Sequence, residues 1–303
     1  MRRETRVTPS SRTRRSSREW FLAGVLFTLA TGVATMALLG PLALGWVDYH
    51  VVDDVENQVV GGDLAAVALV APTCALAGAL VLRGHRAGPV LALAPTAFVM
   101  YLYTQLAIGG EFAAVSGNSE RAFPLMLALF WLAGAGFVLA WRAVDAAALP
   151  EPRDALRRSI GGALLLVAVF LTVGLHLRGV VDVLDGAPNG VEYTQGPTVF
   201  WVVKWMDLGL VVPLTLVTAV GVLRRAAWSR LLVYAVVGWA ALLGTAVAAM
   251  ALVMVTNDDP AASPLLAGGF VGFAVVFLAL AGWLFRLLRD QTWPAGAGGH
   301  PPR

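Results

Sequence analysis

Two side chains of opposite charge, Lys204 and Asp207, stand three residues apart just before an apolar run that ends at Leu223. In a helix this spacing puts them about one turn apart on the same face. A helix needs roughly 20 residues to cross a membrane, so counting back from Leu223 puts both charges at or inside the outer edge of the lipid. A charge at that depth is costly unless it is paired or faces a cavity, which makes this pair our first candidate for a functional site. Trp201 and Trp205 favour the alternative, an interfacial ion pair whose lysine extends into water.

Other polar residues are predicted at the same outer edge. His176 and Arg178 close the fifth apolar run, where they could join Asp182 or Asp185 in a polar cap. Histidine titrates near neutral pH and could relay protons, although a structural role is the commoner one for a histidine near a helix end. The candidate polar site at the outer membrane edge comprises Lys204, Asp207, Glu111, Arg121, His176 and Arg178, and no residue is assigned a catalytic role.

The third apolar run is unusually polar toward its outer end, where it carries Tyr101, Tyr103, Thr104 and Gln105. Tyrosines at this depth are expected as anchors at the membrane interface. A binding cavity lined by these side chains is the alternative.

The segment after the first apolar run is acidic and also holds a histidine. Its ionisable residues are Asp48, His50, Asp53, Asp54, Glu56 and Asp63. Carboxylates are the ligands that hard divalent cations prefer, but this spacing matches no ligand motif, so a solvated acidic loop is favoured. The one cysteine, Cys74, lies in an apolar run and is expected to be a buried, inert thiol. We predict no metal and no cofactor.

The elements that must position these residues are hydrophobic helices. Of 303 residues, 58% are hydrophobic and 14% are charged, against roughly 45–50% and about 25% in soluble domains. The predicted fold class is all-α, a polytopic membrane protein with eight transmembrane helices, because eight apolar runs approach or exceed bilayer length. These helices are expected at about residues 20–45, 64–83, 88–108, 123–142, 159–178, 203–223, 231–255 and 262–286.

The basic residues predict the orientation of these helices, because basic flanks stay on the cytoplasmic side. With the N-terminus inside, the cytoplasmic segments hold 19 of the 22 basic residues, and only Arg121, Arg178 and Lys204 lie outside. The use of 21 arginines and one lysine is typical of a GC-rich genome. We therefore expect a multi-pass protein of the bacterial cytoplasmic membrane with both termini in the cytoplasm, and disordered tails at residues 1–18 and 291–303.

The two halves of the chain show a weak internal repeat at a shift of 141 residues, which aligns Leu69–Pro72 with Leu210–Pro213. A parallel duplication of four plus four helices, a design known among transporters, would give this pattern, as would chance agreement between apolar helices. Pro72 and Pro213 each remove one helix hydrogen bond, so both helices are predicted to kink there and to flank a common cavity.

Two segments carry a resemblance to other proteins. Residues 116–121 (SGNSER), which lead into Phe123-Pro124-Leu125, and residues 204–209 (KWMDLG), which lead to Pro213, resemble segments of uncharacterised multi-pass membrane proteins of high-GC, actinobacterial-type bacteria. The likeness as a whole covers about a fifth of the chain. No activity is assigned to that group, so the resemblance implies a membrane topology and nothing about chemistry.

Several function classes are excluded and three stay open. There is no phosphate-binding glycine-rich loop, no zinc-type pair of histidines and no nucleophile elbow, so the chain is not expected to be an ATP-driven pump by itself. The arginines sit at segment ends and not on a basic face, so nucleic acid is not an expected partner. The lipid bilayer is the expected surrounding, and a homo-oligomer or a membrane partner protein stays open. The hypotheses are secondary transport of a small solute or ion, a non-catalytic subunit or sensor acting through a partner, and third an enzyme acting on lipids.

Overall fold

The computed structural model describes residues 16–186 and 190–289. Within these residues, eight helices are long and apolar enough to cross a membrane. Four of these spans form the first half of the chain: α1 (Ser17–Leu39), α2 to α3 (Asp53–Leu82), α4 (Ala87–Ile108), and a 3-10 turn with α5 (Ser119–Ala143). The second half consists of α6 to α7 (Asp154–Leu184), α9 to α10 (Pro197–Leu223), α11 (Ser229–Thr256) and α12 (Pro264–Arg286). A short helix, α8 (Val191–Gln195), precedes α9.

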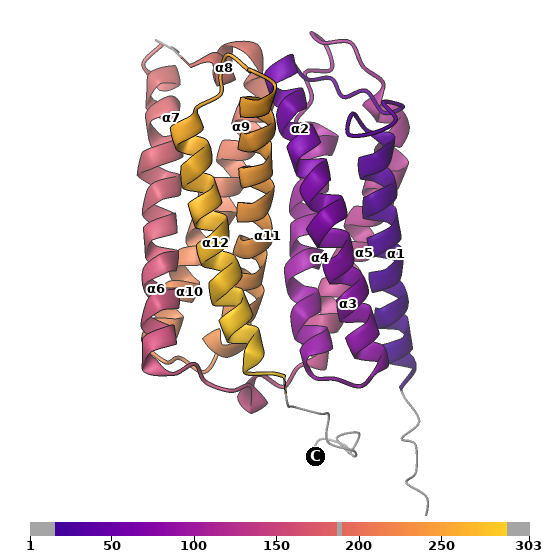
Figure 1. The fold of residues 1–303 in the computed structure, drawn as a ribbon, viewed down its shortest axis with the longest axis vertical. Coiled ribbons are helices and arrows are strands. Elements are labelled where there is room, and N and C mark those ends of the chain that lie inside the picture. Colours follow the sequence, from indigo (N-terminus) through magenta and orange to yellow (C-terminus); the bar gives the residue numbers. More distant parts are fainter. Residues whose placement is uncertain (1–15, 187–189, 290–303) are drawn as a thin grey trace, which may run out of the picture.

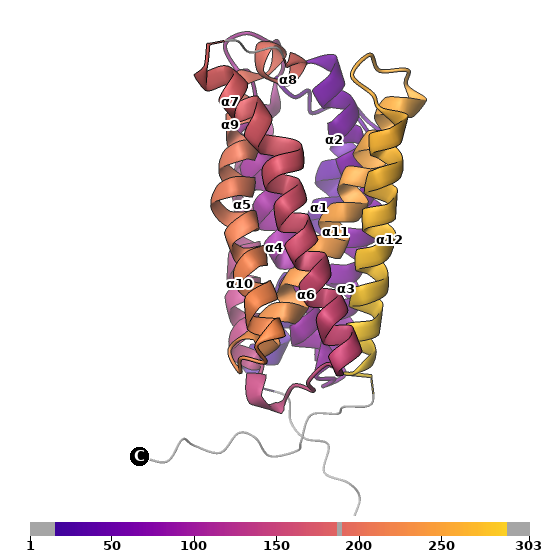
Figure 2. The same cartoon turned by 90° about the vertical axis from the view of Figure 1, so that its left-hand side faces the viewer.

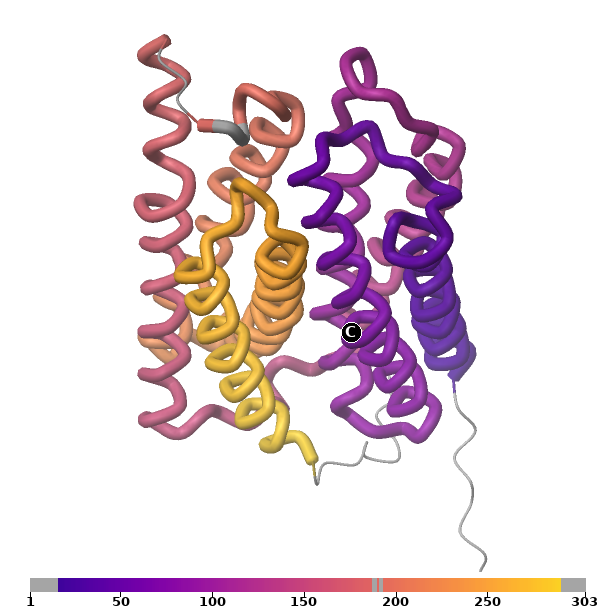
Figure 3. The backbone as a smooth tube through the Cα atoms, turned by 45° about the horizontal axis from the view of Figure 1, so that its top comes forward, coloured from indigo at the N-terminus to yellow at the C-terminus, as the bar shows by residue number. Residues whose placement is uncertain are grey.

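The two halves form two bundles that lie side by side (Figure 1). In the first half, α1 packs against α3 and α5, and α4 packs against both of these helices. The second half has the same order of neighbours, because α6 contacts α10 and α12 and α11 contacts both. Figure 2 shows the second half with the span of α6 and α7 in front, and the tilted view of Figure 3 keeps the two groups apart. Each half is therefore a closed ring of four consecutive spans.

Helix α11 joins the halves by packing against α2 and α4 of the first half. Its contact with α2 is close because Gly61 has no side chain: a Cβ at Gly61 would lie 2.3 Å from the Met250 Cα. Toward α4, a Cβ at Gly238 would lie 2.8 Å from the Cβ of Ala94. Small residues allow this approach, as in other helix pairs within membranes.

Both described ends of the chain lie at one end of the molecule, which we call the near end; the loops after α1, α4, α7 and α11 lie at the opposite, far end (Figure 1). Ser16 and Glu19 form a capping box that begins α1, so Ser17 and Arg18 of the predicted N-terminal tail are helical. The rest of residues 1–18, and the predicted tail at 291–303, lie outside the described residues.

The helix bounds differ from the predicted ones where hydropathy alone sets the limit. The first helix ends at Leu39 and not near residue 45, because Gly40 and Pro41 follow. The second span begins at Asp53 and not near residue 64, with three acidic residues in its first turn, where the helix dipole favours negative charge. The sixth begins at Pro197 and not near residue 203, since proline suits the first helical position.

Candidate functional site

Three spans contain an internal π-helical segment, which is rare and is frequent at functional sites. The segments are η1 (Ala66–Val70) in the second span, η4 (Phe170–His176) in the fifth and η5 (Asp207–Val211) in the sixth. Pro72 and Pro213, where kinks are predicted, each stand two residues after a π segment. Proline lacks the N–H that would continue the helical ladder, which accounts for the irregularity beside it. The segments η4 and η5 contact each other.

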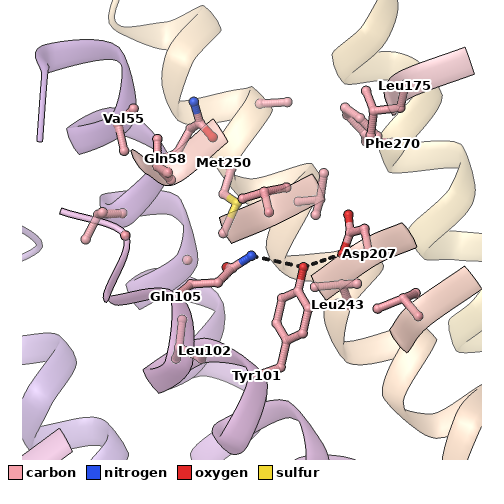
Figure 4. Close-up of a pocket in the computed structure, with 18 of the residues that line it drawn as sticks. Val55, Gln58, Tyr101, Leu102, Gln105, Leu175, Asp207, Leu243, Met250 and Phe270 are labelled. Carbon is pink, nitrogen blue, oxygen red and sulfur yellow. Dashed lines mark hydrogen bonds between the residues drawn. The ribbon is translucent and has the colours of Figure 1, made fainter. Parts of the chain in front are cut away.

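An ionisable pair lies where η4 and η5 meet. His176 is the last residue of η4 and Asp207 is the first residue of η5, and His176 Nε2 lies 2.8 Å from Asp207 Oδ2. The other carboxylate oxygen, Oδ1, accepts a 2.6 Å hydrogen bond from the Tyr101 hydroxyl of α4. That hydroxyl in turn accepts a hydrogen bond of 3.0 Å from Gln105 Nε2 (Figure 4). Asp207 is therefore held by one residue of its own half and by one residue of the first half.

The pair is shielded from the surroundings. Only 7% of Asp207 and 1% of His176 are exposed. His176 Nδ1 is buried and has no hydrogen-bond partner among the described residues. A proton shared across the short contact can reside on the imidazole or on the carboxylate without a change of partners. The geometry is thus that of a group that can carry one proton at membrane depth, where ionisable residues commonly mark proton or substrate pathways.

The pair faces a cavity of about 380 Å³ that lies between the halves. This is within the size range of small-molecule sites. The first half contributes Tyr101, Gln105 and Asp63 to its wall, and the second half contributes His176, Lys204 and Asp207. Figure 4 shows Tyr101, Gln105 and Asp207 of this wall. Most of the remaining wall is apolar, with Phe170, Trp239, Phe270 and Phe273 among the lining residues. The lining reaches Tyr49, His50 and Ser263, so the cavity extends toward the far end.

Of the six predicted site residues, three line this cavity: His176, Lys204 and Asp207. Lys204 is buried, with 6% exposed, and its Nζ lies 4.4 Å from the centroid of the Phe200 ring. Asp207 Oδ1 accepts from Tyr101 and Oδ2 lies against His176, so Asp207 has two partners that the sequence did not predict. The sequence analysis named both Tyr101 and Asp207, but it did not predict that these two side chains meet.

The other three predicted residues lie elsewhere. Glu111 is buried at the far end and accepts hydrogen bonds from the backbone N–H (2.5 Å) and hydroxyl (2.8 Å) of Thr198. Thr198 is in the first turn of α9, so Glu111 of the first half caps a helix of the second half. Arg121 is exposed. Arg178 is also exposed, and it contacts Asp182 one turn along the same helix at 3.8 Å.

The predicted acidic loop is not a uniform solvated segment. Asp53, Asp54 and Glu56 begin α2, whereas Asp63 lies deep in the molecule with 4% exposed. Among the described residues no three histidine, cysteine or acidic side chains form a group that could hold a metal ion. Cys74 is buried.

His50 joins two far-end loops. Its Nδ1 donates a 2.7 Å hydrogen bond to the Val115 carbonyl. Its Nε2 lies 2.7 Å from Glu120 Oε2. Both ring nitrogens face acceptors, so the geometry fits the doubly protonated imidazolium. The hydrogen bond to Val115, and after it the one to Glu120, raise the pKa of His50 above its usual value.

Because the pKa of His50 is higher in the folded protein, its contribution to stability is complete below the unfolded pKa of about 6.5. That contribution should be lost as pH rises through the raised pKa. We expect hydrogen exchange of residues 109–118, corrected for intrinsic rates, to accelerate over that rise in the wild type. In His50→Gln the corrected exchange should be faster at low pH and nearly independent of pH, and equal pH profiles for the two proteins would refute the imidazolium.

The eight apolar helices and their outward side chains define the class of protein. Large apolar residues such as Leu166, Leu265 and Trp131 are 70%, 88% and 68% exposed, which suits a lipid surrounding. The chain is an integral, multi-pass membrane protein. Comparison with family models, with curated proteins and with solved structures finds no match to this chain.

Proposed function

We propose that the chain is a secondary transporter of a small solute, driven by protonation of Asp207. The observation that carries this proposal is the bond of Tyr101 to Asp207, which joins the two halves at the wall of the cavity between them. A transporter needs a site near mid-membrane, two bodies that can move against each other and a group that couples the two. The cavity, the two four-helix rings and Asp207 supply these three parts.

The coupling follows from hydrogen-bond strength. A hydrogen bond to an ionised carboxylate is roughly twice as strong as one between neutral groups. Protonation of Asp207 therefore weakens its bond from Tyr101 and loosens this tie between the halves. His176, 2.8 Å away, can supply or remove the proton. Lys204 lies one turn from Asp207 and lines the same cavity.

An internal repeat supports movement of one half against the other. The π segments η1 and η5 start at residues 66 and 207 and end at residues 70 and 211, so both bounds differ by the shift of 141 that aligns the sequences. The order of helix neighbours is also the same in the two halves. We infer a parallel duplication of four plus four helices, a design that suits alternating access.

The topology proposed here is that of a bacterial cytoplasmic membrane protein. We expect the near end to face the cytoplasm, because 19 of the 22 basic residues belong to segments on that side. The far end, toward which the cavity extends, would then face outward. The two segments that resemble multi-pass proteins of high-GC bacteria lead us to group the chain with them.

Sided labelling of a cavity cysteine tests this function. Thr215 lines the cavity on α10 and is 3% exposed, and Cys74 can be replaced by alanine to remove the natural thiol. In Cys74→Ala/Thr215→Cys, a membrane-impermeant thiol reagent should react from the far end at high pH. At low pH that reaction should slow and reaction from the near end should rise.

The labelling rate is normalised to that of Cys74→Ala/Glu56→Cys. Position 56 is exposed at the far end, so the rate of its cysteine changes with pH only through the fraction of thiolate. Right-side-out and inverted vesicles separate the two faces. A cysteine at position 215 that reacts from one face alone at every pH would overturn alternating access.

A further inference from the structure

Besides Asp207, two further carboxylates line the cavity, Asp54 and Asp63, and neither belongs to the proton-carrying pair. Asp63 of α2 lines the cavity wall and is 4% exposed. Its Oδ2 is buried without a hydrogen-bond partner among the described residues. Tyr49, which also lines the cavity, has a buried hydroxyl with no partner in the same part of the chain. A Cβ at Gly40 would lie 3.0 Å from Asp63 Oδ2 and 3.5 Å from the Tyr49 ring, so the two side chains meet at one place.

Two buried polar side chains without partners need an explanation. An unpaired carboxylate in an apolar surrounding is costly, and such groups in proteins are paired or bind a ligand. An arrangement of this kind at a cavity wall is suited to a ligand that brings the missing positive charge. The Tyr49 hydroxyl beside it can accept or donate one further hydrogen bond.

The other residues of the cavity wall indicate whether a metal ion or an organic cation fits beside Asp63. Bare metal ions require several oxygen or nitrogen ligands, and the described residues hold no group of three such side chains. Around the carboxylates the wall is mainly apolar and partly aromatic, with Tyr101, Phe170, Trp239 and Phe270. Aromatic faces attract cations, and an apolar wall favours an apolar body.

We propose that this cavity binds a lipophilic organic cation, with the charge at Asp63 and the apolar body against the aromatic wall. This inference rests on the proposed function, for which it names the substrate class. It also predicts how the cation and the proton affect each other's binding. A cation at Asp63 and a proton at the Asp207–His176 pair lie in one cavity and repel each other, so binding of one favours release of the other.

The repeat strengthens the assignment of the charge to the first half. Counting 141 residues on from Asp63 leads to Lys204, so the two halves carry opposite charges at corresponding places, each three residues before a π segment. Both residues line the cavity. A cation is therefore expected on the side of Asp63 and away from the ammonium of Lys204.

Binding of two shape-matched ions tests the proposal. Tetraphenylphosphonium and tetraphenylborate have nearly the same size and apolar surface but opposite charge. Each is titrated calorimetrically into the full-length protein in lipid nanodiscs at pH 8, with empty nanodiscs subtracted. We expect saturable binding of the phosphonium and none of the borate. In Asp63→Asn the affinity for the phosphonium should fall by tenfold or more, on the order of the loss of one charge-assisted contact.

The matched control is Glu56→Gln, which removes an exposed carboxylate from the same helix and should leave the affinity unchanged. Thermal denaturation identifies a folding defect; Asp63→Asn should be at least as stable as the wild type, because it removes an unpaired buried charge. In the wild type, lowering the pH should weaken phosphonium binding. Equal binding of both ions, or full affinity in Asp63→Asn, would overturn the cation site.

The outcome is separable from that of the labelling experiment. Phosphonium binding that depends on Asp63, together with labelling of position 215 from one face alone, would support the cation site and contradict transport. If the labelled face changes with pH but phosphonium binding does not depend on Asp63, the results would support transport and contradict the cation as its substrate.

Discussion

Asp207→Asn should remove the pH dependence of access to the cavity. The asparagine side chain has nearly the same shape and still offers an oxygen to the Tyr101 hydroxyl, but it cannot gain or lose a proton. In the wild type, the difference between a charged and a neutral bond is expected to be about 1–2 kcal/mol, which is roughly a tenfold change in a conformational equilibrium. In Asp207→Asn the labelling ratio of the two faces at position 215 should vary less than about twofold over the same pH range.

Tyr101→Phe provides the matched variant from the other half, because it deletes the donor to Asp207 and keeps the aromatic ring that packs edge-on against Trp239. It should hold the ratio of the two faces near the value that the wild type reaches at low pH, with little pH dependence, because the bond that protonation weakens is already absent. Wild-type pH dependence in Asp207→Asn would mean that another group carries the proton.

Of the substitutions considered, Glu111→Ala should lower the stability of the folded protein most. The variant leaves the backbone N–H and hydroxyl of Thr198 without their acceptor at the start of α9 and removes a negative charge from a helix N-terminus. Hydrogen bonds to charged groups contribute about 1.5–3 kcal/mol each, so a loss of about 3 kcal/mol is expected for this pair. For a chain of this size that corresponds to a fall in the melting temperature of about 6–12 °C.

Thermal denaturation of the purified protein in detergent measures this fall. Glu111→Gln should lose about half as much, because the amide keeps one acceptor oxygen but no charge. Glu56→Gln, an exposed acidic residue at the same end, should be neutral within about 0.5 kcal/mol. A melting temperature of Glu111→Ala within 2 °C of the wild type, on the order of one weak contact, would refute the capping role.

The spans were predictable from the sequence because hydropathy over bilayer length is a local property. The class of fold is confirmed, with eight apolar helices in the described residues. The ends of the helices were predicted less well. Acidic first turns such as Asp53 to Glu56 and the proline start at Pro197 follow capping rules, which a count of apolar residues does not contain.

The site could be predicted only in part, because its contacts join residues distant in the sequence. Lys204, Asp207 and His176 stood out as ionisable residues in apolar surroundings, and all three line the cavity. That His176 meets Asp207, and that Tyr101 does so from the other half, depends on how helices pack. Asp63 was assigned to a solvated loop because the acidic residues Asp53 to Glu56 lowered the hydropathy of the segment in which its helix begins. The π segments have no signal in the sequence other than the two prolines.

An infrared pH titration of the protein in lipid tests most directly whether Asp207 carries a proton at the cavity between the halves. The carbonyl band of a protonated carboxylic acid is separate from the bands of carboxylates and amides. We predict a titrating carboxylic band in the wild type that is absent from Asp207→Asn and is shifted in frequency in Tyr101→Phe, which loses the hydrogen bond to that carboxyl. Identical titrations of the wild type and Asp207→Asn would contradict the proposed coupling.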